Sequence, residues 1–257
     1  METTAPDQRR FGGIDRLYGA GALERATAAQ VCVIGIGGVG SWAAEALARS
    51  GIGRLTLIDL DHVAESNINR QVHALEPTLG AAKVLAMRER IALINPGCRV
   101  DAVEAFIDEE NVAGLLPACD AVIDAIDQVR AKAALIAHCR RQRRRIVTTG
   151  GAGGRTDPTR VVVDDLSRTV QDALASKVRA RLRKEYGFPR EPGKKFGVEC
   201  VFSPEGIRRP AAADACATPV DGGAGLACAG YGSSMAVTAA FGLAAAARVL
   251  AGILPAR

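Results

Sequence analysis

The sequence is poor in aromatic residues, which make up 4% of its 257 residues, and it has one tryptophan and three histidines. His62, His73 and His138 are too dispersed to indicate a metal site or a catalytic pair. No two cysteines are spaced as CxxC, so we expect no four-cysteine structural zinc site. Residues 1–10 are polar and lack an apolar stretch of the signal-peptide type, which favours a cytoplasmic protein.

Disulfide bonds are not expected either. The seven cysteines are odd in number and scattered, and most lie in apolar stretches, which favours reduced thiols in a cytosol. They are Cys32, Cys98, Cys119, Cys139, Cys200, Cys216 and Cys228.

A large net charge is also missing. Lysine and arginine exceed aspartate and glutamate by five, which allows an acidic partner without requiring one. One apolar run, Ala236 to Leu254, is long enough to cross a bilayer, but it is mostly alanine and glycine and contains Arg248. Small side chains gain little from transfer to lipid, so we expect a buried C-terminal helix rather than a membrane span.

Short apolar runs alternate with stretches of helical periodicity in the first part of the chain. Strands are expected at 31–34, 55–58, 99–103, 121–123 and 146–148, and helices at about 39–47, 80–94, 108–116 and 129–143. This alternation predicts an α/β protein with a mostly parallel, doubly wound sheet of the Rossmann type.

The pattern changes after Gly154. A strand at 160–163 and a strongly basic helix at 169–186 are expected, followed by long loops at 188–195 and 203–225 and then by the apolar helix. We therefore divide the chain into residues 1–154 and an extension, 155–257.

A glycine motif follows the first predicted strand. Gly35, Gly37 and Gly40 form GxGxxG between a strand and a helix, and Asp59 ends the next strand 19 residues later. The glycines allow a phosphate to approach the helix N-terminus closely, and Asp59 can bind ribose hydroxyls. This arrangement predicts a nucleotide site, the alternative being a merely tight turn.

Two cations and two carboxylates narrow the choice of nucleotide. Arg70 and Lys83 follow the second strand, and cations beyond a glycine loop suit a triphosphate better than a dinucleotide. Taken singly, each is more often a surface charge. Asp124 and Asp127 end the fourth strand, where a carboxylate can hold Mg²⁺. We expect Asp124 to cap the following turn and Asp127 to serve as the metal ligand.

These motifs resemble the ubiquitin-activating-enzyme-like adenylyltransferases, which include the molybdopterin- and thiamine-biosynthesis enzymes. The resemblance covers residues 10–150 and rests on GIGGVG, Asp59, SNINRQ, Lys83 and the IDAID that ends at Asp127. It implies that ATP or its Mg²⁺ is contacted by Gly38, Asp59, Asn67, Arg70, Lys83 and Asp127. Residues 1–154 would then be an ATP-binding adenylylation domain.

Further segments resemble one branch of this family, the tRNA threonylcarbamoyladenosine dehydratases. They are RFGGIDRLYG, VTTGGAGG, FGVECVFS and LACAGYGSS. The resemblance implies a homodimer that uses ATP to activate a carboxylate on a tRNA anticodon-loop adenosine, which then closes into a ring. An arginine that reaches ATP across the dimer in other members is replaced by Gly13, and Arg16 is a candidate substitute.

The extension is assigned to tRNA and dimer contacts by the same resemblance. Cations at 140–145 and on the basic helix, with Arg179, Arg181 and Arg183 at its centre, would neutralise tRNA phosphates, although solvated helix faces explain them equally well. Cys228 is either a buried small residue or a thiol that works with a cysteine desulfurase or other sulfur-acceptor system. The sequence leaves open whether a monovalent cation binds.

Three functions remain in competition. The first is the tRNA-modifying dehydratase, the second an adenylyltransferase that activates a ubiquitin-like or sulfur-carrier protein, and the third a dehydrogenase that uses NAD. Arg70, Lys83 and Asp127 together argue against NAD. The missing CxxC pairs and the basic helix argue against the carrier-protein enzyme.

Overall fold

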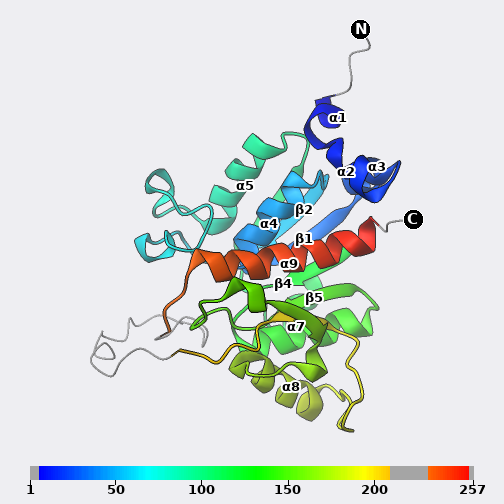
Figure 1. The fold of residues 1–257 in the computed structure, drawn as a ribbon, viewed down its shortest axis with the longest axis vertical. Coiled ribbons are helices and arrows are strands. Elements are labelled where there is room, and N and C mark those ends of the chain that lie inside the picture. Colours follow the sequence, from blue (N-terminus) through cyan, green and yellow to red (C-terminus); the bar gives the residue numbers. More distant parts are fainter. Residues whose placement is uncertain (1–5, 209–230, 255–257) are drawn as a thin grey trace.

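A computed structural model describes residues 6–208 and 231–254 of the protein (Figure 1). In this part of the chain, seven strands form one sheet in the order β3-β2-β1-β4-β5-β7-β6. All neighbours are parallel except β6 and β7. The strands are β1 (Gln30–Ile34), β2 (Arg54–Ile58), β3 (Arg99–Val103), β4 (Ala121–Asp124), β5 (Arg145–Thr149), β6 (Val162–Asp165) and β7 (Glu199–Phe202).

Helices cover both faces of the sheet. They are α1 (Pro6–Phe11), α2 (Gly13–Tyr18), α3 (Ala22–Ala28), α4 (Gly40–Arg49), α5 (Lys83–Ile94), α6 (Val112–Leu115), α7 (Val129–Arg141), α8 (Ala173–Glu185) and α9 (Met235–Ile253). Single 3-10 turns lie at Glu65–Asn67, Glu76–Thr78, Pro158–Arg160 and Leu166–Arg168.

The alternation of side chains along each strand separates two hydrophobic layers. In β1, Val31 and Val33 pack with α4, α5 and α9, whereas Cys32 and Ile34 pack with α7 and α8 on the other face. Because both faces are buried, the inner strands are mostly apolar, as is usual for parallel sheets. The predicted doubly wound α/β class is confirmed.

The apolar C-terminal run forms α9, which lies alongside α4 over the sheet (Figure 1). Gly242 allows this close packing, because a Cβ there would lie 2.4 Å from the carbonyl oxygen of Val39. By length and composition α9 could cross a membrane, but its Val237, Phe241 and Val249 are fully buried in the core. The expectation of a buried helix is confirmed.

Some predicted boundaries were wrong. The helix expected from Gly80 begins only at Lys83, and the one expected near 108–116 is a single turn. The strand expected at 160–163 lies two residues later, and β7 was not predicted, nor were the three N-terminal helices. Of the loop expected at 203–225, residues 209–225 lie outside the described residues.

The extension after Gly154 contributes β6 and β7 to the same sheet as β1–β5. The functional division at residue 154 stays a prediction. What the topology does establish is that the carboxyl ends of β1, β4, β5 and β7 lie at one edge of the sheet, where ligands of doubly wound folds bind.

Candidate nucleotide and acyl-transfer site

The glycine loop joins β1 to α4 and forms part of a cavity of about 320 Å³. Gly35, Gly37 and Gly38 line this cavity. Gly35 has a φ of +85°, and a Cβ on Gly40 would lie 1.8 Å from the carbonyl oxygen of Gly35. Gly35 and Gly40 are therefore required for the tight turn, whereas a Cβ on Gly37 would meet no atom within 4 Å, so its backbone is open to a ligand.

Asp59, at the end of β2, braces the glycine loop. Its Oδ2 accepts a hydrogen bond from the backbone N–H of Ile36 at 2.5 Å, and its Oδ1 accepts one from the N–H of Asp61 at 2.8 Å. Burial raises the pKa of Asp59, against the nearby charge of Lys83, which lowers it. The side chain lines the cavity, so its remaining acceptor capacity is available to a ribose hydroxyl.

The segment between β2 and α5 brings Asn67 and Arg70 to the same cavity. Asn67 is buried, and its Oδ1 caps the turn by accepting from the N–H of Ala64 at 3.1 Å. The backbone of Arg70 is fixed by the indole of Trp42, which donates to its carbonyl at 2.9 Å. Its guanidinium donates to the carbonyl of Ser66 at 2.7 Å, which holds it at the cavity wall.

Lys83 is the first residue of α5, whereas the helix expected at about 80–94 would have placed it one turn inside. Its side chain is 7% exposed, and its Nζ lies 2.7 Å from Oδ2 of Asp61, which is itself half exposed. Asp61 was not singled out from the sequence. A triphosphate in the cavity would compete with this carboxylate for the lysine.

Asp124 and Asp127 have separate roles in the structure. Asp124 is fully buried, accepts from the N–H of Ile126 at 3.1 Å, and pairs with Lys132 at 2.9 Å. The expectation that it caps the turn is confirmed. Asp127 instead lines the cavity, where burial raises its pKa although the charge of Lys132 opposes this.

The donor set fits a magnesium ion. Mg²⁺ is usually held by one or two carboxylates together with substrate phosphates, and Asp127 lines the cavity that the glycine loop also lines. Arg70 and Lys83 line the same space. The structure thus brings all three predicted catalytic residues to one cavity.

An apolar part of the cavity was missed in the sequence. Ala105, Phe106 and Ile107 follow β3 and line the cavity, and Phe106 is 54% exposed. An exposed aromatic ring beside a nucleotide pocket offers a surface for a base. The available signal was an apolar triplet that begins two residues after the third predicted strand ends.

The arginines proposed for tRNA contact interact with their own chain. Arg179 donates to the carbonyl of Thr169 at 2.9 Å, and Arg181 pairs with Glu185 at 2.7 Å. Arg183 stacks over the ring of Phe196 with its guanidinium carbon 5.1 Å from the ring centroid. All three are partly buried, whereas Lys177 and Lys184 are the exposed cations of α8.

Arg16 lies exposed on α2 and is not among the residues that line the cavity. Cys216 and Cys228 lie outside the described residues, so the prediction for Cys228 stays open. The other cysteines are free thiols, and burial raises the pKa of Cys139 to about 12. Thiols in that state are poor nucleophiles.

A sequence profile of the ThiF family matches residues 13–254. The chain belongs to the ThiF family. An Escherichia coli K12 protein named tRNA threonylcarbamoyladenosine dehydratase is 51% identical over 248 residues, which are 95% of this chain and 92% of that protein. The resemblance inferred from the sequence motifs is confirmed.

Solved structures agree with this family membership. A crystal structure of E. coli tRNA N6-threonylcarbamoyladenosine dehydratase in complex with ATP matches with a TM-score of 0.88 and 48% identity, covering 98% of this chain and 97% of that one. An E. coli molybdopterin-synthase adenylyltransferase is 37% identical over 110 residues, which are only 43% of this chain. The similarity to the dehydratase therefore covers almost the whole chain, whereas the similarity to the adenylyltransferase covers less than half of it.

Proposed function

We propose that this protein adenylylates the threonylcarbamoyl carboxylate of threonylcarbamoyladenosine in the tRNA anticodon loop, and that the activated group then closes into a ring. The observation that carries the proposal is the cavity that Arg70, Lys83 and Asp127 line together with the glycine loop. The similarity to dehydratases along 95% of the chain supports the substrate.

The first chemical step joins the carboxylate to the α-phosphorus of ATP. A carboxylate oxygen attacks phosphorus, the bond to the β-phosphate breaks, and pyrophosphate leaves. Arg70 and Lys83 stabilise the negative charge that grows on the departing pyrophosphate. A magnesium ion held by Asp127 would supply further charge stabilisation there.

The second step is a ring closure that needs no external nucleophile. A nucleophilic atom within the threonylcarbamoyl group attacks the acyl carbon and loses its proton, and the bond between that carbon and the AMP oxygen breaks. AMP carries away one former carboxylate oxygen, so the tRNA has lost one water. The cavity residues act by orientation and charge, because an acyl adenylate is a mixed anhydride and already carries a good leaving group, AMP.

The wider setting follows from the same proposal. The protein would act in the cytoplasm, as a homodimer, with ATP, Mg²⁺ and tRNA. A cysteine desulfurase or related sulfur-acceptor partner is proposed from the family resemblance alone.

The test is nucleoside mass analysis after incubation of the protein with ATP, Mg²⁺ and tRNA that carries threonylcarbamoyladenosine. We expect a product lighter by one water, with AMP and pyrophosphate formed in equal amounts. The carrier-protein alternative predicts no change in the tRNA, and adenylate formation on a peptide C-terminus instead. Calorimetry should also show that ATP binds more tightly than NAD, and tighter NAD binding that ATP fails to displace would refute the nucleotide assignment.

A further inference from the structure

The cavity has a second wall, where β5 ends and α8 begins. It is formed by Thr149, Gly150, Ala152, Gly153 and Leu174. This wall carries no charged side chain, whereas the opposite side presents the glycine loop and the cations after β2. Phosphates are stabilised on the cationic side. The uncharged wall is therefore left for the acyl part of the second substrate.

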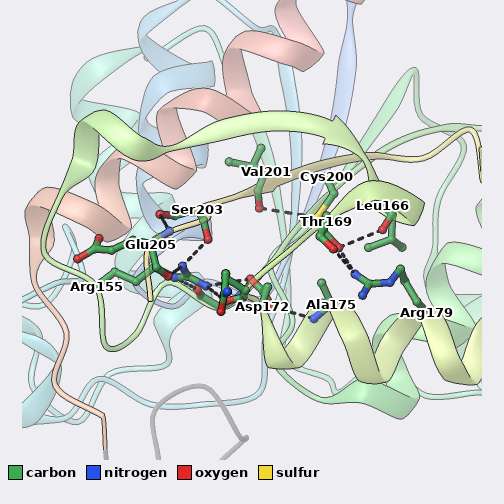
Figure 2. A network of polar contacts seen from close by, with 12 residues as sticks. Arg155, Leu166, Thr169, Asp172, Ala175, Arg179, Cys200, Val201, Ser203 and Glu205 are labelled. Atoms are coloured by element: carbon green, nitrogen blue, oxygen red, sulfur yellow. Dashed lines mark hydrogen bonds and ion pairs between the residues drawn. The ribbon is translucent and has the colours of Figure 1, made fainter. Parts of the chain in front are cut away.

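Asp172, the N-cap residue of α8, holds this wall in place (Figure 2). Its Oδ2 accepts from the backbone N–H of Gly151 at 2.9 Å, and its Oδ1 accepts from the N–H of Ala175 at 2.8 Å. A Cβ on Gly150 would lie 2.1 Å from Oδ2. The carboxylate can thus approach the wall this closely only because residue 150 is glycine.

Arg155 supplies the opposite charge from within the core. It is 2% exposed, and its Nη2 lies 3.4 Å from Oδ2 of Asp172. Its guanidinium also donates to four main-chain carbonyls, those of Gly151, Gln171, Ser203 and Glu205. Figure 2 shows how these bonds join the turn after β5, the start of α8 and the chain after β7.

A buried ion pair is weak evidence for stability in itself, since desolvation offsets much of the attraction. What sets this pair apart is its place beside the cavity. Asp165 offers a comparison, because its carboxylate also accepts backbone N–H bonds, from Ser167 and Phe196 at 2.9 Å each and from Gly197 at 2.7 Å. Neither these four residues nor their neighbours in the chain line the cavity, whereas Gly150, Ala152 and Leu174, which adjoin the hydrogen-bond partners of Asp172, do.

We propose that Asp172, with Arg155 as its buried counter-ion, is a positioning residue that sets the Gly150–Gly153 turn as the surface against which the threonylcarbamoyl group lies. The proposal rests on the proposed function. Displacement of the turn would misplace the carboxylate relative to the α-phosphate, but would leave the nucleotide contacts after β1 and β2 intact.

The test compares Asp172→Asn with Asp165→Asn. Each change keeps the side-chain shape, yet the new amide cannot accept from both sets of N–H groups, so one N–H faces another donor. We expect Asp172→Asn to lower kcat/KM for modified tRNA by about tenfold or more while the Kd for ATP stays within about twofold. Asp165→Asn should change neither. Arg155→Lys keeps the positive charge but loses the planar guanidinium with its several N–H donors. It should therefore lower kcat/KM for modified tRNA by a smaller factor, again without changing the Kd for ATP.

Steady-state rates are measured with varied tRNA at saturating ATP, below the unfolding transition of every variant, and ATP binding is measured by calorimetry. Equal losses of ATP affinity and of kcat/KM for tRNA in Asp172→Asn would overturn the positioning role. The same tRNA-specific loss in Asp165→Asn would also overturn it. If the wild type binds ATP but does not convert modified tRNA, the proposed function fails, and this inference fails with it.

Discussion

Lys132 supports the turn that carries Asp127, and this makes it the most informative position to perturb. It is 2% exposed, and its Nζ donates to the carbonyl of Ile126 at 2.8 Å and to that of Asp124 at 3.3 Å. It also pairs with Oδ1 of Asp124 at 2.9 Å. One buried ammonium group thus fixes the backbone on both sides of the turn after β4.

Lys132→Met keeps the length of the side chain and removes its charge. Asp124 would then be a buried carboxylate without a cation, held only by the N–H of Ile126 and the hydroxyl of Thr148. Breaking a buried ion pair in this way costs about 3–5 kcal/mol, so we expect the free energy of unfolding to fall by that amount. Adding Asp124→Asn removes the stranded charge and should recover more than about 1 kcal/mol.

Equilibrium urea unfolding, followed by far-UV circular dichroism and by the fluorescence of the single tryptophan, Trp42, measures both changes. A loss below about 1 kcal/mol in Lys132→Met, or strict additivity of the two substitutions, would refute this account of the pair.

The same substitution has a pH signature at Asp127. Burial raises the pKa of Asp127, and the positive charge of Lys132 works in the opposite direction. Without that charge the pKa rises further, so Asp127 takes up its proton at higher pH. A protonated carboxyl binds Mg²⁺ poorly, and the acidic limb of the turnover profile should therefore move to higher pH. An unmoved limb, or one shifted to lower pH, would contradict this.

Three further predictions concern the site and its partner. Asp127→Asn should lower magnesium-dependent turnover by about a hundredfold or more. The same substitution should also stabilise the nucleotide-free protein at neutral pH, because the raised pKa of Asp127 means that its charged form destabilises the folded state as the pH rises. This stabilisation should disappear once the pH falls below the ordinary aspartate pKa, where the carboxyl is protonated in both states. Urea unfolding at several pH values measures it. Gly40→Ala should abolish ATP binding in calorimetry, since its Cβ would lie 1.8 Å from the carbonyl oxygen of Gly35. Lys177→Glu and Lys184→Glu should each reduce the salt slope of tRNA binding by about one, measured by filter binding, without altering ATP affinity.

The nucleotide half of the site was predictable because its signals are local. Gly35, Gly37 and Gly40 are close in sequence, and the turn they form is required by the geometry between a strand and a helix. Asp59 and Asp127 could be placed from strand ends alone, because the carboxyl ends of parallel strands meet at one edge. Boundaries were less certain where no cap residue marked them, as at Lys83, which follows Ala82.

The second wall could not be predicted, because it depends on contacts between distant segments. β7 has four residues, too few for a periodic pattern, and it pairs with β5 only after a connection of about fifty residues. Nothing in the sequence distinguishes Arg155 and Asp172 from the other charged residues of this region. Their burial follows from β7, since the chain after this strand covers Arg155.

The cations of α8 show that the sequence does not reveal which charged side chains remain exposed. A helical repeat specifies which side chains share a face, but not which face meets the rest of the protein. Leu174, Val178 and Leu182 define the buried stripe of α8, and Arg179 and Arg181 lie close enough to its border to find carbonyl and carboxylate partners. Cations that already have such partners lose them on binding a phosphate, which offsets part of the gain. We therefore expect the exposed cations of α8 to bind phosphates better than the partly buried ones. The sequence alone does not distinguish these two groups.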